Sequence, residues 1–311
     1  MRSAARISIV LWISVLICWG CAGSRDALKN IPTAINQVNP AKGLNKKIAI
    51  ALTQTPPSAI GRQVGDLFFK SLLDAIRDDG SHLQLVTRQD TQWPEYLNEM
   101  IQEAGLSGHY LDLAEKIRLA GFNAWAFARI EKMWPVTRKT GIFYFRKDSY
   151  FIYVEVSFAV YDPFTGAKII DDVVETSTKV SEDDSIAFAA GEAVEIDNLN
   201  EIIEEIGSDL GERAAEILND QPWLTSVVEV EGDRILLSAG TQSGLQGGER
   251  LAVFEGRRTI DGQNGERFIV PGNKVGDLEV VRVSEQVSEA KAQATSGAAK
   301  IQVGDIAVAV K

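Results

Sequence analysis

The sequence predicts an α+β protein, in which an α/β sandwich at residues 46–222 precedes a small all-β, SH3-like barrel at residues 223–311. Two patterns support this fold class. Up to Pro222, runs with strand spacing alternate with runs of apolar residues at helical spacing, as in a layered fold. After Pro222, short apolar runs are separated by glycine turns without a helical period, which is typical of a small barrel or sandwich.

The first 21 residues have the three-part layout of a secretory signal peptide. Arg2 and Arg6 precede the apolar run Ile7–Trp19, which is shorter than the ~20 residues that span a bilayer as a helix. The run ends at Gly20-Cys21 and resembles a bacterial lipoprotein signal, which implies that Cys21 is the lipid-attachment residue. Ala22, in place of aspartate, then implies the periplasmic face of the outer membrane. An ordinary cleaved signal and an uncleaved anchor are the alternatives.

Composition limits the remaining possibilities. Both cysteines, Cys18 and Cys21, lie in the signal segment, so a mature chain has no internal disulfide. A length of 311 residues favours two domains after the leader. The formal charge of -11 argues against nucleic acid, whose phosphates attract Lys and Arg, and against adhesion to anionic lipid through overall charge. Residues 22–45 contain two prolines and no period, and we interpret them as a tether.

The first half of the sandwich reads as alternating strands and helices. Lys46–Leu52 is an apolar run expected to form a buried strand, and Gly61–Arg77 has the spacing of an amphipathic helix. We then expect a strand at His82–Thr87, a helix at Tyr110–Leu119 and a central strand at Asn123–Met133.

From Gly141 the pattern becomes antiparallel. Strands are expected at Phe143–Lys147 and Tyr150–Tyr161 about a turn at residues 147–149, and another at Lys168–Lys179 after the loop Asp162–Gly166. Glu192–Asn219 is expected to be the longest helix. The predicted order is β-α-β-α-β-β-β-α.

The second domain shows strand signals only. Val227–Glu231 and Arg234–Ser238 flank a hairpin-type turn at Gly232-Asp233. Further strands are expected at Arg250–Phe254, at residues 276–284 and 289–294, and at Gly304–Val310.

These layouts resemble known envelope proteins. Residues 46–222, with the turn Asp162-x-x-Thr165-Gly166, are similar to the N-terminal domain of TolB, the middle domain of the flagellar assembly protein FlgT, and the related domains of CsgG and LpoB. Residues 223–311 resemble the C-terminal domain of FlgT, on the strength of the glycines at 240, 244, 248, 276 and 304. The resemblance implies an envelope protein that assembles with or docks onto other proteins.

Few residues suggest catalysis. The two histidines, His82 and His109, belong to no metal-binding motif, and residues 105–109 only approach a nucleophile elbow. The glycines of residues 240–248 lack the ending of a phosphate loop. Acidic residues at Glu182–Asp184 and on the polar face of the last helix (Glu201, Glu204, Glu205 and Asp209) are typical of solvated surfaces. We therefore predict a protein that is not an enzyme and needs no cofactor or metal.

The segment Trp134–Tyr150 is the strongest candidate for a binding site. It interleaves cations with aromatic residues in an acidic protein, a composition typical of interface anchors. The candidate docking residues are Trp134, Arg138, Lys139, Phe143, Phe145, Arg146 and Lys147. The alternative is an exposed hairpin whose aromatic residues pack inward while the cations are solvated.

We therefore expect a lipid-anchored envelope protein that binds or assembles other envelope proteins, with self-association left open. The second hypothesis is a subunit of a CsgG-like export channel, which needs lipid-facing strands of about 9–11 residues. Here the first arm, Phe143–Lys147, is too short. A third hypothesis, an envelope hydrolase, lacks a nucleophile–base pair.

Overall fold

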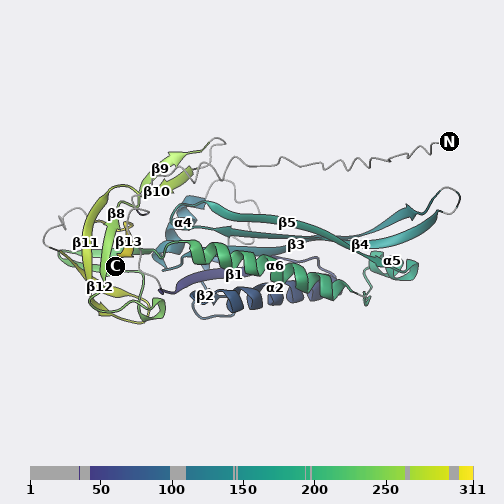
Figure 1. Cartoon of the computed structure of the whole chain (residues 1–311), viewed down its shortest axis with the longest axis horizontal. Helices are drawn as coiled ribbons and strands as arrows, with labels where there is room; N and C mark the ends of the chain where they lie inside the picture. The colour runs from purple at the N-terminus through teal and green to yellow at the C-terminus, as the bar shows by residue number, and fades with distance from the viewer. Residues whose placement is uncertain are drawn as a thin grey trace, which may run out of the picture. The chain divides into compact units, whose positions relative to one another are not determined.

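The computed structural model describes residues 35, 43–98, 110–142, 144, 146–192, 194–196, 198–262, 267–293 and 301–310, within one compact unit, Ala34–Lys311. The signal segment with Cys21, most of the predicted tether, residues 105–109, Phe143 and Phe145 lie outside the described residues. Among the residues described, no helix combines the length and apolar character needed to cross a membrane. The predicted fold class is confirmed: a mixed α/β sheet region is followed by a closed six-stranded barrel (Figure 1).

A five-stranded sheet forms the first region, in the order β2-β1-β3-β4-β5. β1 is parallel to β2 and β3, whereas the β3–β4 and β4–β5 pairs are antiparallel. Its strands are β1 (Lys46–Gln54), β2 (Leu83–Val86), β3 (Ala124–Thr140), β4 (Lys147–Tyr161) and β5 (Lys168–Val180). The first three strands are parallel because helices connect them, and the last three are antiparallel because short turns connect them.

Two hydrophobic cores lie on the two faces of this sheet. One packs against α2 (Ala59–Asp79) and α6 (Leu199–Asp220), and the other contains residues of α4 (Tyr110–Leu119) together with Trp93 and Leu97. α2 and α6 run side by side in close contact (Figure 1). Gly207 and Gly211 permit this approach, since a Cβ on Gly211 would lie 2.7 Å from the Leu72 carbonyl oxygen.

The second region is a barrel with the strand order β11-β12-β7-β6-β13-β8. Its interior is lined by aliphatic residues such as Val227, Leu251 and Leu278. The barrel strands are β6 (Thr225–Glu231), β7 (Arg234–Leu237), β8 (Arg250–Phe254), β11 (Lys274–Val283), β12 (Ser288–Ala292) and β13 (Ile306–Val310). A 3-10 turn η3 (Thr241–Ser243) and a separate hairpin of β9 (Arg258–Asp261) and β10 (Arg267–Val270) complete it.

Two predicted boundaries in the sheet region are wrong. Phe143–Lys147 is not a strand: the first arm of the hairpin is the continuation of β3, which pairs with β4 as far as Thr140↔Lys147. The predicted helix Glu192–Asn219 begins at Leu199, because Asn198 has a left-handed φ of 62° that interrupts any earlier helical turn. A separate helix, α5 (Glu182–Ala189), precedes it, capped by the Ser181 hydroxyl, which accepts from the Asp184 N–H.

Buried polar contacts join the sheet region to the barrel. Arg118 at the end of α4 is 2% exposed, and its Nη1 donates to the Gly304 carbonyl at 2.6 Å. Its own carbonyl accepts from the Ser238 hydroxyl at 3.2 Å. The Asp162–Gly166 turn takes part as well, because the Ile269 N–H of β10 donates to the Thr165 carbonyl at 2.8 Å. The two regions are therefore connected by specific hydrogen bonds and not by chain linkage alone.

The residues before β1 also contact the barrel. Leu44 is buried in the barrel core, and Ile35 is buried with Phe164 and the barrel residues Phe254 and Ile306. The Asn45 N–H donates to the Ser243 carbonyl at 2.9 Å. The C-terminal end of the predicted tether therefore packs against the folded chain.

Candidate functional site

The β3–β4 hairpin extends beyond the part of β3 that other strands support. β1 pairs with β3 only up to Gln54↔Arg129, so the rest of β3 pairs with β4 alone. This explains how Pro135 is accommodated in a 17-residue strand, because proline has no N–H to donate and is tolerated where one strand edge is free. β5 pairs with β4 as far as Tyr150↔Val180, so only the end of the hairpin, residues 138–149, extends beyond the sheet (Figure 1).

One face of the hairpin carries alternating cations and aromatic rings. Trp134 pairs with Tyr153, and their rings stack with centroids 5.4 Å apart. The Lys132 ammonium lies 4.8 Å from the Trp134 ring centroid, and the Arg138 guanidinium lies 4.9 Å from that of Tyr153. Phe151 is 5.9 Å from the same guanidinium. We call Lys132, Trp134, Arg138, Phe151 and Tyr153 the aromatic ladder.

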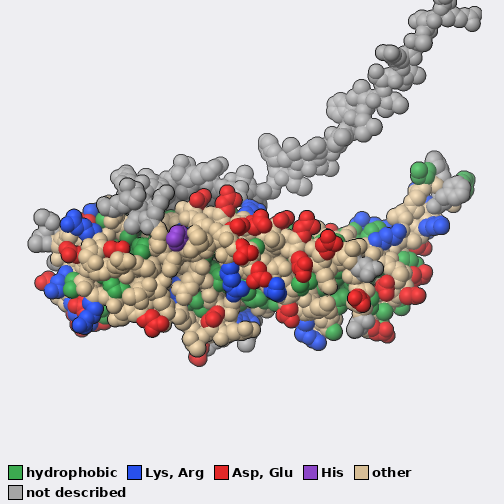
Figure 2. Space-filling view, turned by 60° about the horizontal axis from the view of Figure 1, so that its bottom comes forward, with side chains coloured by type: hydrophobic (Ala, Val, Ile, Leu, Met, Phe, Trp, Pro, Cys, Tyr) green, Lys and Arg blue, Asp and Glu red, His purple; other side chains and the backbone are tan. Residues whose placement is uncertain are grey.

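The end of the hairpin has a different composition, and we call Ile142 and Tyr144 its tip. Ile142 is 74% exposed and Tyr144 is fully exposed. Lys139, Arg146 and Lys147 are exposed immediately behind them. Figure 2 shows this end at the right, with hydrophobic side chains outermost and Lys or Arg side chains behind them.

Charges along the hairpin are partly paired. Lys132 forms an ion pair with Glu155 across the strands at 2.9 Å. Asp148 lies opposite Lys139 in the strand register. A hydrogen bond to Glu182 of α5 raises the pKa of Tyr150, which pairs with Thr137 part-way along the arms. Glu155 and Glu182 therefore lie beside the inner part of the hairpin, while Lys139, Arg146 and Lys147 lie nearer its end with Asp148 among them.

The structure brings together only part of the predicted site. Trp134 and Arg138 share the ladder face, while Lys139 lies on the opposite face because side chains alternate along a strand. Arg146 and Lys147 lie by the tip. Three ladder residues were missed, Lys132, Phe151 and Tyr153. The spacing of Lys132, Trp134 and Arg138, which are two and four residues apart, places them on one face of a strand, but this is visible only if the strand is continued through Pro135.

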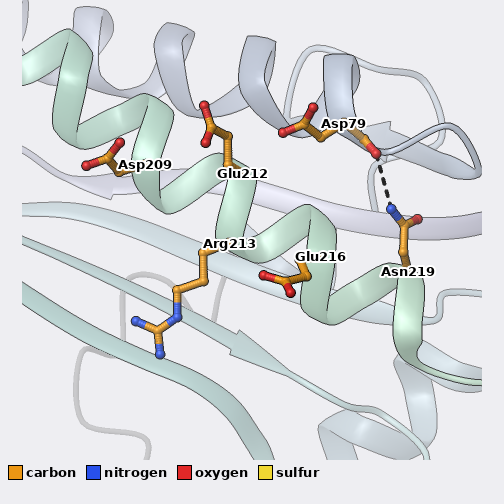
Figure 3. A pocket seen from close by; sticks show the side chains of 6 residues that line it. All are labelled: Asp79, Asp209, Glu212, Arg213, Glu216 and Asn219. Atoms are coloured by element: carbon orange, nitrogen blue, oxygen red, sulfur yellow. Dashed lines mark hydrogen bonds between the residues drawn. The ribbon is translucent and has the colours of Figure 1, made fainter.

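A second candidate is a pocket on the surface of α2 and α6, of about 640 Å³ (Figure 3). It is lined by Asp79, Asp209, Glu212, Arg213, Glu216 and Asn219. Arg213 points away from the carboxylates toward β5, where it pairs with Asp172 at 2.8 Å. Within the described ranges, no group of three or more His, Cys, Asp or Glu side chains is arranged to hold a metal ion. Glu201, Glu204, Glu205 and Asp209 are exposed along α6.

The barrel is similar to a known flagellar domain. Residues 232–309 match the family described as flagellar assembly protein T, C-terminal domain. The match runs from the turn after β6 into β13, so it covers most of the barrel and about a quarter of the chain. The predicted resemblance of this region to FlgT is confirmed. No curated protein matches the chain as a relative.

Three solved structures illustrate the structural similarities of the chain. A hypothetical protein from Chlamydia trachomatis is 12% identical and covers 56% of this chain and 98% of its own, with a TM-score of 0.34. The PelC dodecamer from Paraburkholderia phytofirmans is 13% identical and covers 58% of this chain and 93% of its own, with a TM-score of 0.29. A lipoprotein from Neisseria meningitidis is 9% identical and covers 47% of this chain and 93% of its own, with a TM-score of 0.25. Similarities at this level carry no conclusion about function.

Proposed function

We propose that this chain is a non-enzymatic, lipid-anchored protein of the bacterial envelope that binds another envelope protein through the β3–β4 hairpin, in flagellar assembly or a related envelope process. The match of the barrel to flagellar assembly protein T supports the envelope setting. The Gly20-Cys21 step supports the anchor at Cys21, and Ala22 in place of aspartate supports the periplasmic face of the outer membrane. The formal net charge of -11 argues against nucleic acid as a partner, because the phosphates carry the same sign of charge.

The aromatic ladder is the observation that carries the docking proposal. Trp, Tyr and Arg supply most of the energy at protein interfaces. Here Arg138 already lies over Tyr153, and Trp134 is stacked on the same ring. Side chains that are ordered before binding lose less conformational entropy when a partner arrives. A ladder that is already ordered in this way is thus a ready-made docking surface.

An oligomeric export channel is the second candidate function, and it is favoured because the first arm of the hairpin is β3 and not the short segment Phe143–Lys147. The arms of the hairpin have 17 and 15 residues, so the length requirement of about 9–11 residues per strand is met. The side chains oppose this function, because the outer half of the arms places Lys132 and Arg138 on one face and Lys139 and Asp148 on the other. A ring of subunits in electron micrographs would favour the channel over the docking protein.

Photo-crosslinking in the native cells tests the docking proposal. A photoreactive amino acid at Val136, on the ladder face, should give a discrete crosslink to an envelope protein. Arg138→Ser together with Lys139→Ser should lower that yield about tenfold, as expected for loss of an interface anchor. The matched control is Arg62→Ser with Lys70→Ser, which removes the same charge from exposed positions on α2.

An equal crosslink yield from the hairpin variant and the control, with unchanged circular dichroism, would refute the docking proposal. Replacing Arg146 and Lys147 as well should lower the yield further only if the cations near the tip contact the same protein. The intact mass of protein from the membrane fraction tests the anchor separately. A cleaved N-terminus at Cys21 carrying a diacylglyceryl adduct is expected.

A further inference from the structure

The tip differs chemically from the ladder and calls for a different partner. Tyr144 is fully exposed, and Ile142 is 74% exposed, so two large side chains with apolar surface face water at the end of the hairpin. Three exposed cations outside the ladder, Lys139, Arg146 and Lys147, follow within a few residues of them. One carboxylate, Asp148, lies among these cations.

We infer that the tip contacts the interface of an anionic phospholipid bilayer, with Ile142 and Tyr144 in the boundary between headgroups and acyl chains and the cations on the lipid phosphates. The inference goes beyond the proposed function and assigns the two ends of the hairpin to different partners. The ladder binds protein, and the tip binds lipid.

The size of the tip favours lipid over protein. A stable protein interface covers about 800 Å² on each partner. The end of a two-stranded hairpin, with strands about 4.8 Å apart, offers far less surface. A bilayer imposes no such minimum, because each apolar group that enters it contributes independently. A tyrosine is also suited to this depth, since its ring is apolar and its hydroxyl is polar.

The spacing of the cations matches the depth of an interfacial contact. Lys139 is three residues before Ile142, and Lys147 is three residues after Tyr144. At about 3.4 Å per residue, their Cα atoms lie at most roughly 10 Å behind the tip. Interfacial segments bury their apolar groups about 5–10 Å into the headgroup boundary. Long basic side chains can extend toward phosphates at that level while the tip is inserted.

The net negative charge of the chain does not prevent this contact. Glu182, on α5, reaches the hairpin at Tyr150, which pairs with Thr137. Thr137 is five residues from Ile142, about 17 Å along the strand. The Debye length at physiological ionic strength is about 8 Å, so carboxylates at that distance are largely screened. The local cations therefore decide the attraction between the tip and anionic lipid, although the whole chain carries a net negative charge.

Fluorescence from the tip itself tests the inference. The full chain with Cys18→Ser, Cys21→Ser and Tyr144→Cys carries one thiol, which takes an environment-sensitive dye. Vesicles of phosphatidylcholine with 30% phosphatidylglycerol should shift the emission to the blue and allow quenching by nitroxide on the lipid chains. Vesicles of phosphatidylcholine alone should do neither. The same dye at Val173→Cys, an exposed position on β5, should remain in water.

Charge variants then measure the headgroup contribution. Each Lys or Arg beside an anionic surface strengthens binding about fivefold, so Arg146→Ser with Lys147→Ser should raise the lipid concentration at half-maximal shift about 25-fold. Arg62→Ser with Lys70→Ser, on α2, should leave it unchanged. Equal effects of the two pairs would overturn the inference, because charge at the tip would then have no special role.

Two other results would also overturn it. A dye at residue 144 that stays in water on anionic vesicles would show that the tip does not bind lipid. A dye that is shielded by envelope proteins but not by vesicles would assign the tip to a protein, and would leave the proposed docking function intact. Conversely, loss of crosslinking at Val136 with retained lipid contact at residue 144 would refute the docking function alone.

Discussion

Arg118→Met should show how strongly the sheet region and the barrel depend on each other. Arg118 is 2% exposed, donates from Nη1 to the Gly304 carbonyl at 2.6 Å, and from Nη2 to the Gly256 carbonyl at 3.4 Å. Glu115 lies 3.9 Å away and is half exposed, so it compensates the charge only weakly. Methionine replaces the length of the side chain but none of its donors.

The change in the free energy of unfolding caused by Arg118→Met is the sum of opposing contributions. A charge-assisted hydrogen bond contributes about 1.5–3 kcal/mol, and the carbonyls left without a donor add a cost of similar size. Burial of the guanidinium works in the other direction. Burial lowers the pKa of Arg118 despite the opposing effects of Glu115 and Asp305, so removing the charge regains solvation energy. We expect a net loss of about 2–3 kcal/mol in the free energy of unfolding.

Urea denaturation followed by circular dichroism measures this loss directly. The matched control is Arg62→Met, because Arg62 also donates to one backbone carbonyl, that of Pro57 at 2.7 Å, but in an exposed position. The control should change stability by less than about 0.5 kcal/mol. Hydrogen exchange in β13 and the preceding turn should become faster in Arg118→Met only. A loss no larger than that of the control would refute the reasoning.

Three further predictions concern other parts of the molecule. Gly256→Ala should lower the free energy of unfolding by more than about 2 kcal/mol, because the new Cβ would lie 2.2 Å from the Gly304 carbonyl oxygen. Urea denaturation measures this loss. An unchanged free energy of unfolding would show that the turn before β13 can shift freely. Burial lowers the pKa of Lys46 to about 8, with Asp220 opposing, so the unfolded chain binds more protons than the native one between pH 8 and about 10.4. Stability should therefore rise with pH across that window, and Lys46→Met should reduce the rise; an identical pH profile would contradict the assignment. Trp134→Ala should lower the melting temperature only slightly, since Trp134 lies outside the hydrophobic cores, whereas Trp125→Ala should lower it severely because Trp125 is fully buried against Tyr161. Calorimetry distinguishes the two.

The sequence was informative wherever a residue pattern reports on its own element. The α2 helix was predicted to within two residues because its apolar face is regular. The paired strands β6 and β7 follow in the same way from the Gly232-Asp233 turn. By contrast, α5 has almost no amphipathic pattern, and its acidic first turn read as a solvated surface.

The errors at the candidate site have a physical origin. Pro135 argues against a central strand, and only the pairing shows that β1 stops at Arg129 and leaves this part of β3 with one neighbour. The cations and aromatic residues were recognised by composition, but their division into a ladder and a tip depends on strand register. The role of Arg118 could not be predicted, because its acceptor at Gly304 lies 186 residues away in the chain.

The way the barrel closes sets the order of assembly as the chain emerges from a ribosome or a secretion channel. β6 pairs with β13, which lies 80 residues further along, at Ser226↔Ile306. Until those residues emerge, one edge of β6 has no strand beside it, and Arg118 has no Gly304 carbonyl to bind. The sheet region can complete its own pairings much earlier, since β5 ends at Val180. Closure of the barrel and attachment to the sheet region should therefore be late, coupled events, and a stalled chain lacking β13 would expose an open strand edge to its neighbours.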